Sequence, residues 1–125
     1  MATKIVINVE GVELKGEFFD TPAGQALAQG LPIECRWSRW GDEYYGNTTP
    51  SFGQYQGEET EVLEVGDLAY HSATGWFCLF FGPTPASHGK EPRAAAPVQK
   101  VGRVKGDWSA VKTLGHSIMA RVEAA

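Results

Sequence analysis

The sequence is poor in cysteine, in basic residues and in long apolar runs, and each shortage excludes a class of protein. Two cysteines in 125 residues are too few for a disulfide-stapled scaffold. Lysine and arginine number 11 against 15 acidic residues, a net charge of −4, whereas nucleic acids and anionic membranes are bound by clustered cations. No apolar run approaches the roughly 18 residues of a transmembrane helix, and the first residues lack the apolar centre of a signal peptide. We expect a cytoplasmic protein without a nucleic acid or membrane partner.

Residues that carry metal or nucleophilic chemistry are also few and scattered. Cys35 and Cys78 form no CxxC pair, and His71, His88 and His116 lie far apart in the chain. A GxSxG nucleophile motif is missing from the sequence. We therefore predict no metal site and no cofactor, and we interpret both cysteines as buried free thiols, with a disulfide between them as the alternative.

The sequence does contain enough apolar residues to form one hydrophobic core. Hydrophobic residues make up 42% of the chain, and 125 residues can bury a core without metals or disulfides. We predict a single domain over residues 1–125.

The most apolar segment lies in the middle of the chain. Trp76–Phe81 is a run of six apolar residues between Gly75 and Gly82, which is typical of a strand covered on both faces. Leu68–His71 precedes it by a loop short enough to reverse the chain. The two segments are predicted to pair as an antiparallel hairpin at the centre of the fold.

Alternating apolar residues predict further strands along the chain. The predicted segments are Lys4–Val9, Val12–Phe18, a strand that begins at Ile33, Glu43–Tyr45, a weak Glu61–Val65, Val98–Val104 with a bulge or a close backbone approach at Gly102, and Ile118–Glu123. The last of these also fits helical spacing, so a helix is the alternative there.

Two capping patterns predict short helices, and two long connections separate the strands. Asp20-Thr21-Pro22 starts the first helix, and Asp107 caps a second that is expected to end at a left-handed Gly115. The connection 41–59 is long enough to bind something, to be disordered or to hide a short strand. The proline-rich connection 83–97 is predicted to be a mobile or extended loop.

About eight short strands with two short helices predict a mainly β protein, a closed antiparallel barrel without exposed sheet edges. Three motifs in this order resemble those of the small prokaryotic cyclophilin-like domain family of uncharacterised proteins, over nearly the whole chain. They are Trp40-Gly41-Asp42-Glu43, Gly66-Asp67 and Phe80-Phe81-Gly82-Pro83-Thr84-Pro85. The resemblance implies a cyclophilin-like barrel.

The resemblance also suggests an enzyme hypothesis, because cyclophilins proper are peptidyl-prolyl isomerases. They use an arginine directly after a Phe-His pair to hydrogen-bond the amide nitrogen as it becomes pyramidal. This chain departs from that pattern, since His71 stands between Tyr70 and Ser72. Catalysis by an atypical isomerase would need a substitute such as Arg36 or Arg39.

A binding function is the preferred prediction: a non-catalytic domain that holds a small molecule or a proline-containing peptide in an aromatic groove. Asp42 and Glu43 are adjacent on a strand, so they point to opposite faces and form no acid–base dyad. The alternative for the aromatic residues is that they pack a long loop onto the barrel. The predicted binding residues are Trp40, Glu43, Tyr45, Phe80, Phe81 and Thr84, with Phe52 and Tyr55 as further groove residues. The oligomeric state is left open.

Overall fold

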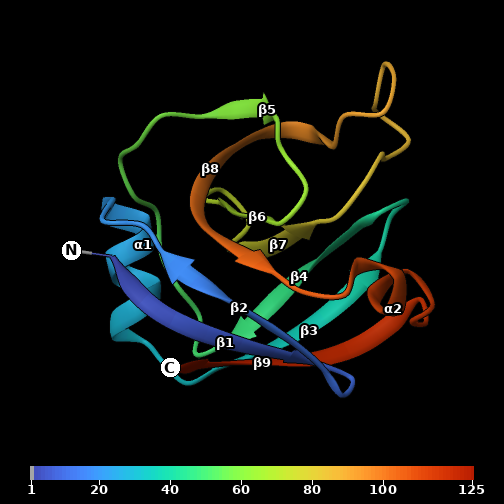
Figure 1. Ribbon diagram of the computed structural model, residues 1–125. Helices are drawn as coiled ribbons and strands as arrows, with labels where there is room; N and C mark the ends of the chain where they lie inside the picture. Colours follow the sequence, from blue (N-terminus) through green and yellow to red (C-terminus); the bar gives the residue numbers. More distant parts are fainter. Residues whose placement is uncertain (1) are drawn as a thin grey trace.

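The computed structural model describes residues 2–125 and shows a barrel with a short second layer (Figure 1). The elements are β1 (Thr3–Val9), β2 (Val12–Phe18), α1 (Pro22–Gln29), β3 (Ile33–Arg39), β4 (Glu43–Thr49), β5 (Thr60–Val62), β6 (Asp67–His71), β7 (Trp76–Phe80), β8 (Arg93–Lys105), α2 (Trp108–Lys112) and β9 (Ser117–Ala124). The strand order β2-β1-β9-β3-β4-β7-β6-β8 is closed by pairing of β8 with β2. Every pairing in this ring is antiparallel. The predicted closed antiparallel barrel of eight strands is confirmed.

Alternate residues of each strand fill the barrel, because successive side chains of a strand point to opposite faces. On β7, Phe77 and Leu79 belong to the interior cluster. The Phe77 ring meets Phe18 edge-on at 6.0 Å between ring centroids, and Trp37 lies 5.8 Å from Phe77. The Trp37 indole N–H donates a 2.9 Å hydrogen bond to the Phe77 carbonyl. The barrel interior is therefore an aromatic core.

A second apolar layer lies outside the barrel wall. The carboxyl-terminal half of β8 pairs with β6 and β2, whereas its amino-terminal half leaves the barrel and pairs with β5. Figure 1 shows β8 curling away from the barrel towards β5. The outward residues of β6, β7 and β8 pack in this layer against Leu63, which follows β5. The cluster consists of Leu63, Ala69, Cys78, Phe80, Ala94 and Val98. The central hairpin is thus covered on its outer face by its own chain.

The predicted helix starts are confirmed, and one predicted helix end is wrong. The Thr21 hydroxyl accepts from the Gly24 amide at 3.0 Å, and the Asp107 carboxylate accepts from the Ala110 amide at 3.2 Å. Helix α2 ends earlier than predicted, with Thr113 as its C-cap, and Gly115 is not among the left-handed glycines of residues 2–125. Neither helix in this range is long and apolar enough to cross a membrane.

Strand boundaries differ most from prediction where pairing depends on distant segments. Residues 93–97 were expected in a mobile or extended loop but form the start of β8, because Arg93 pairs with Val62. Strand β5 covers Thr60–Val62 rather than Glu61–Val65, and β4 extends beyond Tyr45 to Thr49.

Other strand predictions are confirmed. The last segment is the strand β9, not a helix. The expected bulge near Gly102 is present, since the β6–β8 register shifts between Leu68 and Ala69. Cys35 and Cys78 are both free and buried.

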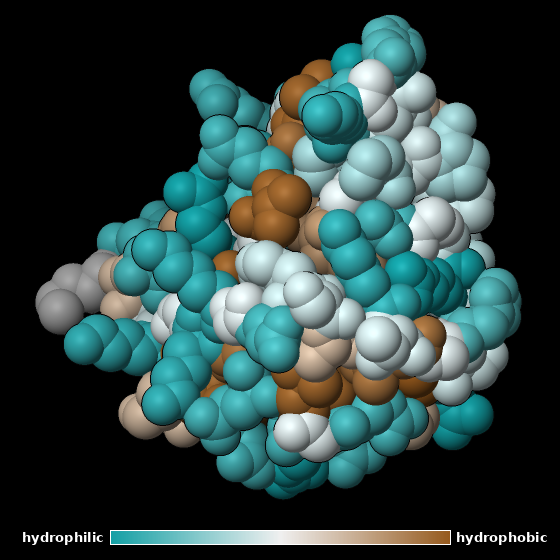
Figure 2. All heavy atoms as spheres, turned by 45° about the vertical axis from the view of Figure 1, so that its right-hand side comes forward, coloured by the Kyte–Doolittle hydropathy of each residue, from teal (hydrophilic) through white to brown (hydrophobic). Residues whose placement is uncertain are grey.

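Large apolar side chains that remain exposed are dispersed over different elements. Val62, Val65, Trp76 and Met119 lie on β5, on the following loop, on β7 and on β9. Figure 2 shows one face of the molecule as largely hydrophilic, with hydrophobic side chains reaching the surface in separate small areas. Trp76 corrects one expectation, because the run Trp76–Phe81 was predicted to be covered on both faces and this ring is 38% exposed.

Candidate functional site

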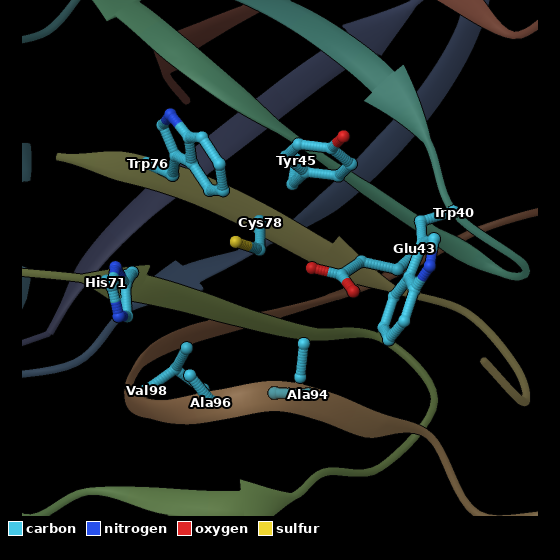
Figure 3. Close-up of a pocket in the computed structure, with 10 residues that line it drawn as sticks. Trp40, Glu43, Tyr45, His71, Trp76, Cys78, Ala94, Ala96 and Val98 are labelled. Carbon is cyan, nitrogen blue, oxygen red and sulfur yellow. The ribbon is translucent and has the colours of Figure 1, made fainter. Parts of the chain in front are cut away.

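A cavity of about 310 Å³ lies on the outer face of the barrel, between the β4–β7–β6 wall and the amino-terminal half of β8 (Figure 3). Its lining comprises Trp40, Glu43, Tyr45, His71, Trp76, Cys78, Ala94, Ala95, Ala96 and Val98. Four strands and the β3–β4 turn contribute, so the site exists only in the folded barrel.

Strand register places the side chains of the cavity wall. Tyr45 pairs with Cys78 and His71 pairs with Trp76, so all four point outward from neighbouring strands. Glu43 lies two residues from Tyr45 on β4 and therefore shares its face. Opposite this wall β8 presents only alanines and a valine. These small side chains leave open the space that larger residues would fill.

Two aromatic rings form one edge of the cavity. The Tyr45 and Trp76 ring centroids are 5.0 Å apart, and Trp76 is among the exposed large apolar residues. Trp40 lies at the other end, beside Glu43 (Figure 3). The site thus offers flat apolar surfaces that are accessible from solvent.

Glu43 is the polar group of greatest interest in the site. Figure 3 shows its carboxyl group pointing into the cavity between Cys78 and Ala94. The residue is 6% exposed, and burial raises the pKa of its carboxyl group from 4.5 to about 8, against a smaller opposing effect of a hydrogen bond with Cys78. Lysine and arginine are missing from the described residues that line the cavity. At neutral pH the carboxyl group is therefore mainly protonated.

The thiol beside Glu43 is not a reactive one. Burial, and then the nearby Glu43 carboxyl group, raise the pKa of Cys78 well above 9.0. A nucleophilic cysteine needs the thiolate form, which this environment opposes. The chemistry that Glu43 and Cys78 offer is consequently binding and proton exchange at Glu43.

We expect Glu43 to make stability depend on pH in a defined window. Its pKa is higher in the folded state, so between about pH 4.5 and pH 8 the folded protein binds more protons than the unfolded chain, and stability falls as pH rises. The loss should be on the order of a few kcal/mol for a shift of this size. Urea unfolding at pH 5 and pH 8 should show this loss in the wild type and a smaller one in Glu43→Gln. Equal losses in the two proteins would contradict the assignment.

The two arginines named as catalytic candidates lie elsewhere. The Arg39 guanidinium donates to the Gly41 carbonyl at 2.8 Å and the Lys112 carbonyl at 2.8 Å, and it pairs with Asp42 at 2.9 Å. These bonds fix the β3–β4 turn to α2. Arg36 is exposed on β3. Neither residue lines the cavity.

Three of the six predicted binding residues, Trp40, Glu43 and Tyr45, come together in the cavity. Phe80 is buried in the outer cluster behind it. Phe81 faces the barrel interior and stacks on Tyr44. The buried Thr84 hydroxyl donates to the Arg93 carbonyl at the start of β8.

The groove residues from the long loop do not reach the cavity. Phe52 packs edge-on against Tyr70 at 6.5 Å between ring centroids, and Tyr55 lies 5.9 Å from the same ring. The Tyr70 hydroxyl donates to the Gly53 carbonyl at 2.6 Å. These aromatics hold the loop against the barrel, as the alternative interpretation proposed.

Sequence reasoning missed most of the lining residues. Trp76 and Cys78 alternate with Phe77, so the sequence predicts that they share one face of the strand. It gives no sign that this face points away from the barrel interior. The run Ala94-Ala95-Ala96 was visible as well, without a signal that it faces the hairpin.

The described residues form no cluster of metal ligands. Among residues 2–125, no three histidine, cysteine, aspartate or glutamate side chains are grouped closely enough to hold an ion.

Comparisons with known proteins agree with the fold. The family model described as cyclophilin-like matches residues 3–123. The solution structure of a hypothetical protein from Archaeoglobus fulgidus is similar, with 31% identity and a TM-score of 0.79 over 99% of this chain and 95% of that one. No curated protein is similar enough to match. Since the family model spans almost the entire chain, this protein belongs to the cyclophilin-like family.

Proposed function

We propose that this protein is a binding domain that holds a small molecule with an apolar group, or a peptide side chain such as that of proline, in the cavity on the outer face of the barrel. The observation that carries the proposal is the Glu43 carboxyl group, which is buried in an apolar cavity without an ion-pair partner among the described lining residues.

The energetic cost of that carboxyl group supports a functional role. Burying a carboxyl group without a charged partner destabilises a protein unless the group is protonated or hydrogen-bonded. An apolar residue at this position would extend the cluster of Cys78 and Phe80 at lower cost. Groups with strongly raised pKa values in clefts are concentrated at functional sites.

The size and lining of the cavity set the ligand class. About 310 Å³ is at the lower end of the range for small-molecule sites. Aromatic rings on one side and alanines on the other favour a flat or ring-shaped apolar group. This fits a single small ligand or one residue of an extended peptide.

A neutral fluorescent probe tests the proposal. N-phenyl-1-naphthylamine should bind saturably with one site per chain and gain fluorescence in the apolar cavity. Ala96→Phe places a ring in the cavity and should weaken binding at least about tenfold, which corresponds to about 1.4 kcal/mol.

The matched control is Ala124→Phe, which adds the same ring at an exposed position of β9. It should bind the probe like the wild type, and thermal unfolding should show that both variants are folded. Equal binding by the Ala96 variant, or no saturable binding by the wild type, would contradict the proposal.

The isomerase alternative receives less support from the geometry. An isomerase of this type needs an arginine beside the bound amide, but the described lining residues include none. Arg39 would have to break its bonds to three backbone carbonyls and to Asp42 in order to reach a substrate. We therefore favour binding over isomerisation.

A further inference from the structure

The described lining of the cavity holds a carboxyl group but no lysine or arginine. Glu43 is the acidic residue of the described lining, and three basic side chains of β8 form ion pairs outside it. Lys100 and Arg103 pair with the buried Asp67 at 3.2 Å and 3.3 Å, and Arg93 pairs with Glu91 at 3.0 Å. The described lining residues include no lysine or arginine to compensate a ligand carboxylate or phosphate, and His71 is their one imidazole. The site therefore disfavours anions.

Each element around Glu43 contributes side chains to the lining of the cavity. Strand β4 contributes Tyr45, whose hydroxyl points away from the Glu43 carboxyl group in Figure 3. Strand β7 contributes Cys78, and β6 contributes His71, whose Nδ1 lies 2.8 Å from the Thr74 hydroxyl. The β8 side contributes only alanines and Val98. The faces of Trp and Tyr rings carry negative potential and attract cations within about 6 Å. Two tryptophans, one tyrosine and one carboxyl group thus surround the same space.

We propose that the ligand group held in this cavity is an organic cation of the alkylammonium type, with Glu43 as its counter-charge and the aromatic rings of Trp40, Tyr45 and Trp76 against its methyl groups. This inference rests on the proposed binding function and adds the charge of the ligand. Quaternary and methylated ammonium groups are recognised by aromatic rings, whose faces attract the cation.

Binding of a cation must be coupled to loss of a proton. The cation interacts with the carboxylate and not with the carboxylic acid, so a protein whose Glu43 pKa is about 8 has to release that proton when it binds at pH 7. The fraction of ionised Glu43 rises about tenfold between pH 7 and pH 9, and apparent affinity follows that fraction. A neutral ligand that accepts a hydrogen bond from protonated Glu43 shows the opposite dependence.

The test compares choline with its neutral isostere 3,3-dimethylbutan-1-ol in amide chemical-shift titrations of the full chain. The range from pH 7 to pH 9 is used because it brackets the Glu43 pKa of about 8. Choline should bind at least about tenfold more tightly than the alcohol at pH 9, and about tenfold more tightly at pH 9 than at pH 7. Glu43→Gln should abolish both differences, whereas Glu13→Gln, exposed on β2, should retain them.

The outcomes distinguish a failure of this inference from a failure of the proposed binding function on which it rests. If N-phenyl-1-naphthylamine binds but choline does not exceed the alcohol, or if affinity rises towards low pH, the cation inference is wrong and the binding function stands. Retention of the choline preference by Glu43→Gln also overturns it. If N-phenyl-1-naphthylamine does not bind to the folded wild type, the binding function itself fails.

Discussion

Replacing Phe77 with alanine should lower the free energy of unfolding by about 3–5 kcal/mol, the usual cost of removing a fully buried phenylalanine. Phe77 is completely buried and contacts Phe18 and Trp37 inside the barrel. Its neighbour Trp76 points the other way and is 38% exposed. Trp76→Ala should therefore cost about 1 kcal/mol or less, mainly through loss of the contact with Tyr45. Urea unfolding of the two variants measures the difference.

Each of these two variants is the control for the other, because both changes remove an aromatic ring from β7. Trp76→Ala should also weaken probe binding in the cavity, so the two variants should show opposite defects. Similar losses of stability in both would mean that β7 does not separate an interior from an exterior face. If the Phe77→Ala protein does not fold at all, the result still agrees with the prediction, provided that the Trp76→Ala protein has a native circular dichroism spectrum.

Replacing Gly16 with alanine should destabilise the barrel by about 3 kcal/mol or more, at the upper end for overpacking. A Cβ atom on Gly16 would lie 1.8 Å from the Arg103 carbonyl oxygen, which is backbone and cannot rotate away. Gly16 pairs with Val104 where β2 meets β8, the junction that closes the barrel. The strands would have to separate, which exposes two sheet edges. Denaturant unfolding and amide exchange of β2 and β8 report both effects.

The matched control is Gly115→Ala, since a Cβ atom there meets nothing within 4 Å and the residue is exposed. That variant should be neutral or slightly stabilised, because alanine restricts the unfolded chain more than glycine does. If Gly16→Ala is equally harmless, the two strands are not in the close contact that the structure shows. Fast amide exchange confined to β2 and β8 would identify barrel opening as the cause.

The site was predictable only in part, and the reason lies in how its residues are linked. Trp40, Glu43 and Tyr45 are close in sequence, so a single motif and one strand period brought them together. Phe81 belongs to the same motif as Phe80 but alternates to the interior, so the prediction of a groove residue there does not match the structure. The burial of Glu43 had no local sign, because it depends on a segment about fifty residues later in the chain, where Ala94 lies.

By itself the sequence determined the local pattern of this protein. Alternation of apolar residues determined most strands, Thr21 and Asp107 determined the two helix starts, and together they determined a closed β-barrel. Tertiary structure alone decided which face of the apolar segment Trp76–Phe81 lines the barrel interior, and that the start of β8 folds over the other face to leave a cavity. The physical reason is that alternation depends on adjacent residues, whereas both faces of this segment are apolar and only contacts with distant strands distinguish them.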